Sequence, residues 1–122
     1  MPNEVVNLDA KLAQFSEHWS PKIVSGFNEC DVMVAKALGE FNWHHHDDTD
    51  DFFLVLKGEL RIEIREGDER KDITLGPGEL FVVPKGVEHR PVADEEVHLL
   101  LIEPKGVPNT GDEATAAQKV AI

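Results

Sequence analysis

Short apolar segments separated by turns fill the middle of the chain, and they constrain its fold more than any other feature. Residues 60–66 alternate strictly, with Leu60, Ile62 and Ile64 on one face and charged residues on the other, as in a half-buried strand. Further apolar segments bounded by turn residues occupy 32–38, 52–56, 73–75, 80–84 and 97–104. Short strands at intervals of roughly 8 to 12 residues are typical of an all-β sandwich or barrel. Strands and helices do not alternate, which disfavours a parallel α/β sheet.

The length of 122 residues fits one domain with three parts. We expect residues 1–30 to form a short N-terminal helix and a leading strand, residues 31–104 to form the barrel, and residues 105–122 to form a turn-rich tail. The helix is predicted because apolar residues recur on one helical face at Leu8, Leu12 and Phe15. Two interpretations of the tail stay open: a loosely attached arm, or a segment that packs on a second subunit.

The charge balance excludes some classes of partner. The chain has 12 Lys and Arg against 24 Asp and Glu, a formal net charge of −12 at pH 7, which repels nucleic-acid phosphates and anionic membranes. No apolar run approaches the roughly 20 residues of a membrane span, and the first residues do not resemble a signal peptide. Cys30 is the single cysteine, so no intrachain disulfide can form. These features predict a cytoplasmic protein that binds neither nucleic acid nor membrane.

The stretch WHHHDDTDD, residues 43–51, places three histidines beside four aspartates. Because residues i and i+2 share a face of a strand, His44 and His46 point the same way, with Cβ atoms about 7 Å apart. Asp51 begins the next apolar segment, and a bend after His46 would bring its carboxylate toward the same point. Two imidazoles and one carboxylate suit Fe(II), Mn(II), Zn(II) or Ni(II). The plainer alternative is a solvated acidic loop.

A third histidine ligand has to come from another part of the chain. His89 is the best candidate, since it follows a glycine turn after the apolar segment 80–84. His98 is the competitor, but it lies inside an apolar segment and is expected to line the barrel beyond the ligands. A calcium-binding loop starting at Asp48 is excluded, because two phenylalanines stand where it needs a polar ligand and a glycine.

Strand parity also predicts which neighbours face away from the ion. Trp43 has the opposite parity to His44, so we expect it to pack outside the site. Arg90 follows His89 and is expected to point away, although a guanidinium would suit a substrate carboxylate.

Two motifs in this order resemble those of the cupins, small jelly-roll barrels built as a double-stranded β-helix. The first cupin motif is G(X)5HXH(X)3–4E(X)6G, and residues 39–58, GEFNWHHHDDTDDFFLVLKG, are similar to it. The second is G(X)5PXG(X)2H(X)3N, and residues 78–93, GELFVVPKGVEHRPVA, are similar to it. The stretch between them is short, as in compact bacterial members. The resemblance implies a cupin barrel that extends to about residue 104.

Three departures from the cupin pattern affect the site. Four residues rather than five separate Gly39 from His44, a small change of length. Asp51 stands where the family has Glu, so its shorter side chain would ligate at longer distance, through water, or not at all. Ala93 replaces an Asn that is not normally a ligand.

The resemblance implies a bound divalent transition metal (Fe, Mn, Zn, Ni or Cu) whose ligands are His44, His46, His89 and, as the fourth, Asp51. Phe53 and Val55 share the parity of Asp51, so we expect them to line an apolar pocket at the ion. Three or four protein ligands leave positions open for water, substrate or oxygen.

Cupins include dioxygenases, isomerases, decarboxylases and binding proteins, so the fold leaves several functions open. We expect a metal-dependent, oxygenase-like enzyme acting on a small organic molecule, with an apolar cavity that suits an aromatic or keto-acid ligand. The alternative is a non-catalytic cupin that binds or senses a small molecule. A sugar-phosphate isomerase is a weaker hypothesis, because the pocket-side strands carry few cationic residues. The family likeness also predicts a homodimer, formed through apolar residues near Ile23, Val24 and Phe27.

Overall fold

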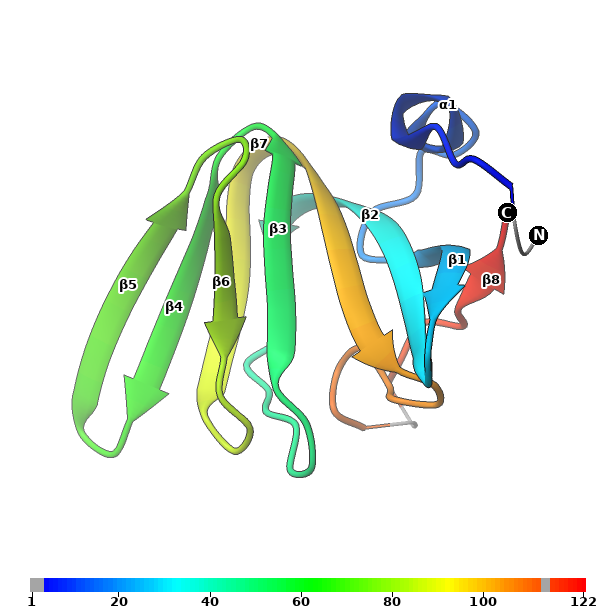
Figure 1. Ribbon diagram of the computed structural model, residues 1–122. Coiled ribbons are helices and arrows are strands. Elements are labelled where there is room, and N and C mark those ends of the chain that lie inside the picture. The colour runs from blue at the N-terminus through cyan, green and yellow to red at the C-terminus, as the bar shows by residue number, and fades with distance from the viewer. Residues whose placement is uncertain (1–3, 113–114) are drawn as a thin grey trace.

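The apolar segments form the strands of a jelly-roll barrel in the computed structural model, which describes residues 4–112 and 115–122 (Figure 1). This is the all-β cupin fold that the sequence predicts. The elements are α1 (Leu8–Leu12), β1 (Lys22–Phe27), β2 (Cys30–Glu40), β3 (Asp51–Lys57), β4 (Leu60–Glu66), β5 (Glu69–Leu75), β6 (Leu80–Val83), β7 (Glu88–Pro104) and β8 (Val120–Ala121).

The long strand β7 organises the barrel because it pairs with three other strands. The strand order is β5-β4-β7-β2-β1-β8, and β3 pairs with both β7 and β6. The start of β7 pairs with β4, where His89 lies opposite Ile64, and its end pairs with β2 and β3, where Leu99 lies opposite Ala35 and Val55. The apolar segment predicted at 97–104 is therefore the second half of a strand that already contains His89.

Alternate residues of the strands point into one main core. Val55, Leu60, Ile62, Val83 and Val97 are all fully buried there. The alternation predicted for residues 60–66 is confirmed on this inner face, but Glu63 on the outer face is only 4 % exposed, so the expected solvated side is partly covered.

A second, smaller core lies under α1. Leu12 of the helix packs with Val24 and Val34. Val24 belongs to this core and Ile23 packs against the main one, and the homodimer through this region stays a prediction. Phe27 remains 62 % exposed. In the part of the chain that the structure describes, no helix is long and apolar enough to cross a membrane.

The tail packs on the barrel of its own chain rather than hanging free. Its last strand, β8, pairs in parallel with β1, and the Lys11 ammonium donates to the carbonyl oxygen of Ile122 (2.8 Å). Nearer the barrel mouth, Gly111 has a φ of +78° and lies so close to the His45 backbone that any Cβ there would collide with the His45 carbonyl oxygen. The tail therefore lies against the histidine-rich loop.

Candidate metal centre

Three imidazoles converge on the carboxylate of Asp51. Its Oδ2 atom lies 2.7 Å from Nε2 of His89, 3.3 Å from Nε2 of His46 and 3.7 Å from Nε2 of His44. Each of these four side chains is less than a tenth exposed. The predicted ligands, drawn from three separated parts of the sequence, thus meet at one buried point.

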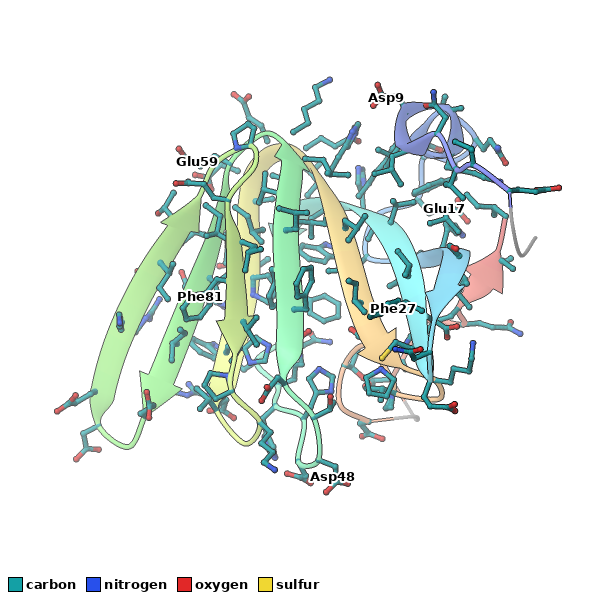
Figure 2. The ribbon with its side chains drawn as sticks, viewed as in Figure 1. Asp9, Glu17, Phe27, Asp48, Glu59 and Phe81 are labelled. Atoms are coloured by element: carbon teal, nitrogen blue, oxygen red, sulfur yellow. The ribbon has the colours of Figure 1, made fainter. Side chains whose placement is uncertain are left out.

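Backbone pairing holds the histidine-rich loop against β7. His44 and His89 exchange two backbone hydrogen bonds, of 3.0 and 2.9 Å, and form an isolated antiparallel bridge. The Gly86 amide donates to the His46 carbonyl at 2.8 Å. Figure 2 shows Asp48 at the tip of this loop, at the opposite end of the barrel from Glu59. The loop base is thereby fixed next to β7, while its acidic tip points into solvent.

The tautomers of two histidines follow from their hydrogen bonds. Nδ1 of His44 lies 2.8 Å from the carbonyl oxygen of Asn42, and Nδ1 of His89 lies 2.9 Å from that of Val87. A carbonyl oxygen only accepts, so each Nδ1 carries the proton and donates. If these two rings are neutral, the lone pair of each Nε2 faces the Asp51 carboxylate. Two such acceptors repel each other unless a proton or a metal ion lies between them.

His46 supplies the clearest sign that these residues fit a metal ion. Its Nε2 atom is buried and has no hydrogen-bond partner among the described residues, since its 3.3 Å approach to Asp51 lacks hydrogen-bond geometry. A buried polar atom without a partner is costly. Burial lowers the pKa of His46, but the Asp51 carboxylate more than compensates and raises it overall. A cation at this point would satisfy both His46 and Asp51.

The environment of Asp51 favours its ionised form. Burial acts to raise its pKa, but the contacts with His44, His46 and His89 outweigh burial and hold the pKa well below its usual range. The ligand atoms of His44, Asp51 and His89 lie within 4.8 Å of one another, and His46 lies beside them. An anionic oxygen with several imidazole nitrogens is a donor set for a divalent transition metal.

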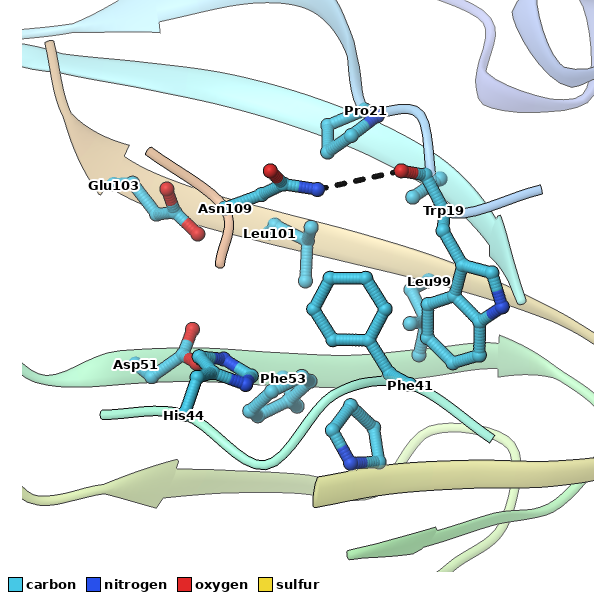
Figure 3. Close-up of a pocket in the computed structure, with 12 residues that line it drawn as sticks. Trp19, Pro21, Phe41, His44, Asp51, Phe53, Leu99, Leu101, Glu103 and Asn109 are labelled. Atoms are coloured by element: carbon cyan, nitrogen blue, oxygen red, sulfur yellow. Dashed lines mark hydrogen bonds and ion pairs between the residues drawn. The ribbon is translucent and has the colours of Figure 1, made fainter. Parts of the chain in front are cut away.

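A narrow apolar pocket opens next to this cluster (Figure 3). His44, Asp51 and Phe53 contribute to its lining, together with aromatic and aliphatic residues from the loop before β1 and from β2 and β7. Phe53 therefore lies where strand parity places it. Val55 has the same parity but is fully buried in the main core and lies beyond the pocket wall.

His98 does not line the pocket, so this expectation is corrected. It lies on the opposite face of β7 from the buried residues Val97 and Leu99. Its Nε2 contacts Glu96 at 3.1 Å, and the same carboxylate binds His18 at 2.8 Å. His98 does share a face of β7 with Leu100 and Ile102, as predicted, but this face points away from the barrel interior.

Glu103 is a pocket residue that the motif search missed. It lines the pocket, is only 4 % exposed, and forms an ion pair with Lys119 of the tail at 2.9 Å. Burial raises its pKa, and the nearby Asp51 charge raises it further. The sequence did contain a sign of this position, because Glu103 has the same strand parity as Leu99 and Leu101, which face inward.

Trp43 and Arg90 lie outside the pocket, as parity predicts. The Trp43 ring contacts the guanidinium groups of Arg65, Arg70 and Arg90, and Arg90 is bonded to Glu63 on the outer face of β4. His45 is also turned outward and contacts Asp47 at 3.0 Å. These residues therefore do not contact the buried cluster.

Comparison with known proteins agrees with the fold. Residues 31–103 match the cupin domain family, and the chain belongs to that family. A cupin-2 domain containing protein from Shewanella frigidimarina is 44 % identical, with a TM-score of 0.78, and the match covers 83 % of this chain and 95 % of that one.

Curated relatives include one protein without an assigned activity and several dioxygenases. The uncharacterized protein YdbB of Bacillus subtilis is 33 % identical over 88 residues, which cover 72 % of this chain and 75 % of YdbB. The 3-hydroxyanthranilate 3,4-dioxygenase of Ruegeria pomeroyi is 36 % identical over 82 residues, which cover 65 % of this chain and 46 % of the enzyme. The matched region is thus about half the length of that dioxygenase.

Proposed function

We propose that this cupin is a metal-dependent, oxygenase-type enzyme that acts on a small aromatic molecule bound in the pocket beside His44 and Asp51. The observation that carries the proposal is the convergence of three imidazole Nε2 atoms on the buried carboxylate of Asp51 at the side of an apolar pocket. A closed structural metal site has no need for such a pocket, whereas a catalytic site requires room for a substrate.

The ligands would be His44, His46, His89 and Asp51, and the ion would be Fe, Mn, Zn, Ni or Cu. When bound, a redox-active ion of this group supplies electron transfer to dioxygen, and any of them polarises a substrate oxygen. The chain itself supplies orientation: the carbonyls of Asn42 and Val87 fix two of the imidazoles. Phe53 and the aliphatic wall of β7 exclude water, which strengthens electrostatic interactions inside the pocket.

The dioxygenase relatives support the aromatic substrate. Their names state that they act on an aromatic molecule, and the likeness to the Ruegeria enzyme covers 65 % of this chain. The shared region is about half of the Ruegeria enzyme, so the reaction and substrate of that enzyme do not transfer as such.

The test is oxygen consumption by the Fe(II)-loaded protein with a panel of phenols, catechols and hydroquinones. We expect oxygen uptake with a matching product for at least one compound. The activity should disappear in His89→Ala and remain in His45→Ala, because His45 is exposed and turned away from the cluster. If the metal-loaded protein binds members of the panel without consuming oxygen, it is a binding protein and the enzymatic proposal fails.

A further inference from the structure

The pocket has two chemically different ends, which Figure 3 shows side by side. Glu103 lies near Asp51 and His44 at one end, and the rings of Trp19 and Phe41 lie at the other. We call the first the polar end and the second the aromatic end. A ligand that reaches the metal centre with one group must place its remaining atoms toward the aromatic end.

The aromatic end is built from a continuous series of ring contacts. The rings of Trp19 and Phe41 stack at 4.8 Å with 26° between their planes. Phe41 also meets the imidazole of His44 edge to face at 5.3 Å. The polar atom of Trp19 is already used, because its Nε1 donates to the Leu38 carbonyl at 2.9 Å. This end therefore offers apolar surface and little hydrogen bonding.

Among the described residues, no lysine or arginine lines the pocket. Asn109 does line it, but both the nitrogen and the oxygen of its side-chain amide already have hydrogen-bond partners. Nδ2 donates to the Trp19 carbonyl at 3.3 Å, and Oδ1 accepts from the Ala117 amide at 2.9 Å. Lys119 is bound to Glu103 and to the Val107 carbonyl oxygen. A negative charge at the aromatic end would thus be buried without a partner, which is strongly unfavourable.

At the polar end, a negative charge on the ligand would be stabilised. A divalent ion held beside Asp51 would leave net positive charge there, and the Glu103–Lys119 pair is neutral as a unit. An ionised hydroxyl group of a ligand would be stabilised at this end. The polar end therefore favours an ionised hydroxyl group, and the aromatic end favours an uncharged, apolar group of the same ligand.

We infer that the pocket selects a small hydroxylated ring whose hydroxyl group faces the metal centre and whose far end, at Trp19 and Phe41, carries no charge. This inference rests on the proposed function, because it uses the same metal centre to hold the hydroxyl group. The cavity is small, about 40 Å³, which favours a ligand of a single ring. Molecules with a carboxylate or phosphate at the far end are excluded.

The experiment uses two ligands that differ in charge and little in shape. Isothermal titration of the Zn(II)-loaded protein would compare 4-(methylsulfonyl)phenol, which is neutral at its far end, with 4-hydroxybenzenesulfonate, which is anionic there. Zn(II) does not react with oxygen, so the titration measures binding alone. We expect the neutral ligand to bind at least tenfold more tightly than the sulfonate.

A second experiment asks whether a positive charge placed at the aromatic end improves binding of the sulfonate. Phe41 is partly exposed, so Phe41→Arg should fold and place a guanidinium at the aromatic end. We expect this variant to bind the sulfonate at least tenfold more tightly than the wild-type protein does, whereas Phe41→Met, the uncharged control, should not.

Each outcome separates the inference from the proposed function. Equal or tighter sulfonate binding by the wild-type protein, binding of neither ligand, or no gain in Phe41→Arg would overturn the inference while leaving the metal centre in place. If none of Fe, Mn, Zn, Ni and Cu binds, the proposed function fails. The ligand pair is then titrated on the metal-free protein, where a retained preference for the neutral ligand supports the charge selection and its loss overturns it.

Discussion

Two buried carboxylates in this protein each contact three basic side chains, but the two clusters are suited to different tasks. Asp51 inside the barrel is 5 % exposed and contacts three imidazoles. Glu63 on the outer face of β4 is 4 % exposed and contacts three guanidinium groups, those of Arg61, Arg70 and Arg90. The exposed fraction of the carboxylate and the number of partners are nearly the same. The arginines are partly exposed and the histidines are buried, but the main difference lies in the chemistry of the bases.

The Glu63 cluster is a fully bonded ion network. Its Oε1 atom accepts from Nε and Nη2 of Arg90 at 2.9 and 2.6 Å and lies 2.8 Å from Nη2 of Arg70, while Oε2 accepts from Arg61 at 3.2 Å. The Trp43 ring covers the cluster, with the Arg90 guanidinium 5.1 Å from its centroid. Because a guanidinium has no lone pair to offer and does not lose its proton, this arrangement cannot bind a metal ion.

The Asp51 cluster is incomplete in comparison. A neutral imidazole has a lone pair at one nitrogen, and the His46 Nε2 atom lacks a hydrogen-bond partner among the described residues. A metal ion can take the place that protons would otherwise occupy. The comparison indicates that a buried carboxylate among three histidines can serve as a ligand site, whereas one among three arginines cannot.

The largest expected difference between the clusters is their response to metal. Zn(II) at one hundred times its dissociation constant should raise the free energy of unfolding by about 2.7 kcal/mol, because it binds the folded state. The gain should vanish in His89→Ala and persist in Glu63→Gln. Urea unfolding with and without Zn(II) measures it, and a gain that survives in His89→Ala would place the metal elsewhere.

Removing the carboxylate of the arginine cluster should affect stability instead. Glu63→Gln should lower the free energy of unfolding by about 2 kcal/mol, less than for a fully buried pair because the arginines are partly exposed. Metal affinity should stay unchanged. Glu66→Gln is the matched control, since Glu66 is exposed on the same strand and should change stability by less than about 0.5 kcal/mol. Equal effects of the two substitutions would contradict the assigned role of Glu63.

The stabilisation by Glu63 should depend on pH. Burial acts to raise the pKa of Glu63, but hydrogen bonds from Arg90 and Arg61 and the nearby positive charges lower it below its usual value of 4.5. A carboxyl group with a lowered pKa in the folded state stabilises the protein fully above the unfolded-state pKa and loses this effect as the pH falls through the folded-state pKa. The stability difference between the wild-type protein and Glu63→Gln should therefore be constant near neutral pH and shrink in acid below about pH 4.5. Urea unfolding of both proteins from pH 7 to pH 3 checks this. A stability difference that grows in acid would contradict the lowered pKa of Glu63.

The smallest effect should come from Trp43. Its ring lies 4.1 Å from the Arg65 guanidinium, and Trp43→Leu should cost about 1 kcal/mol through lost cation–π contacts. A double-mutant cycle with Arg65→Gln should give a coupling energy of about 0.5 kcal/mol. Zero coupling would mean that the ring only covers the arginines.

The four residues of the candidate metal centre could be predicted from sequence because two motifs fix their spacing. His44 and His46 have the same parity, and the glycine turn before His89 brings it into a backbone bridge with His44. The observed cluster contains these three and Asp51.

Other features depend on contacts between distant residues, so local patterns could not reveal them. The burial of Glu63 depends on arginines from β5 and β7, and the tail position depends on pairing between β8 and β1. His98 was misplaced because both faces of β7 carry hydrophobic residues, so alternation does not tell which face is inside.

Metal content most directly tests the claim that the Asp51 cluster is a metal centre. Mass spectrometry of tag-free protein would measure it in the wild-type protein and in His46→Ala. The account predicts near-stoichiometric Fe, Mn, Zn, Ni or Cu in the wild-type protein and its loss in the variant. Absence of metal from both proteins, even after reloading with each ion, would contradict it and leave Asp51 with its three histidines as an ion cluster like that of Glu63.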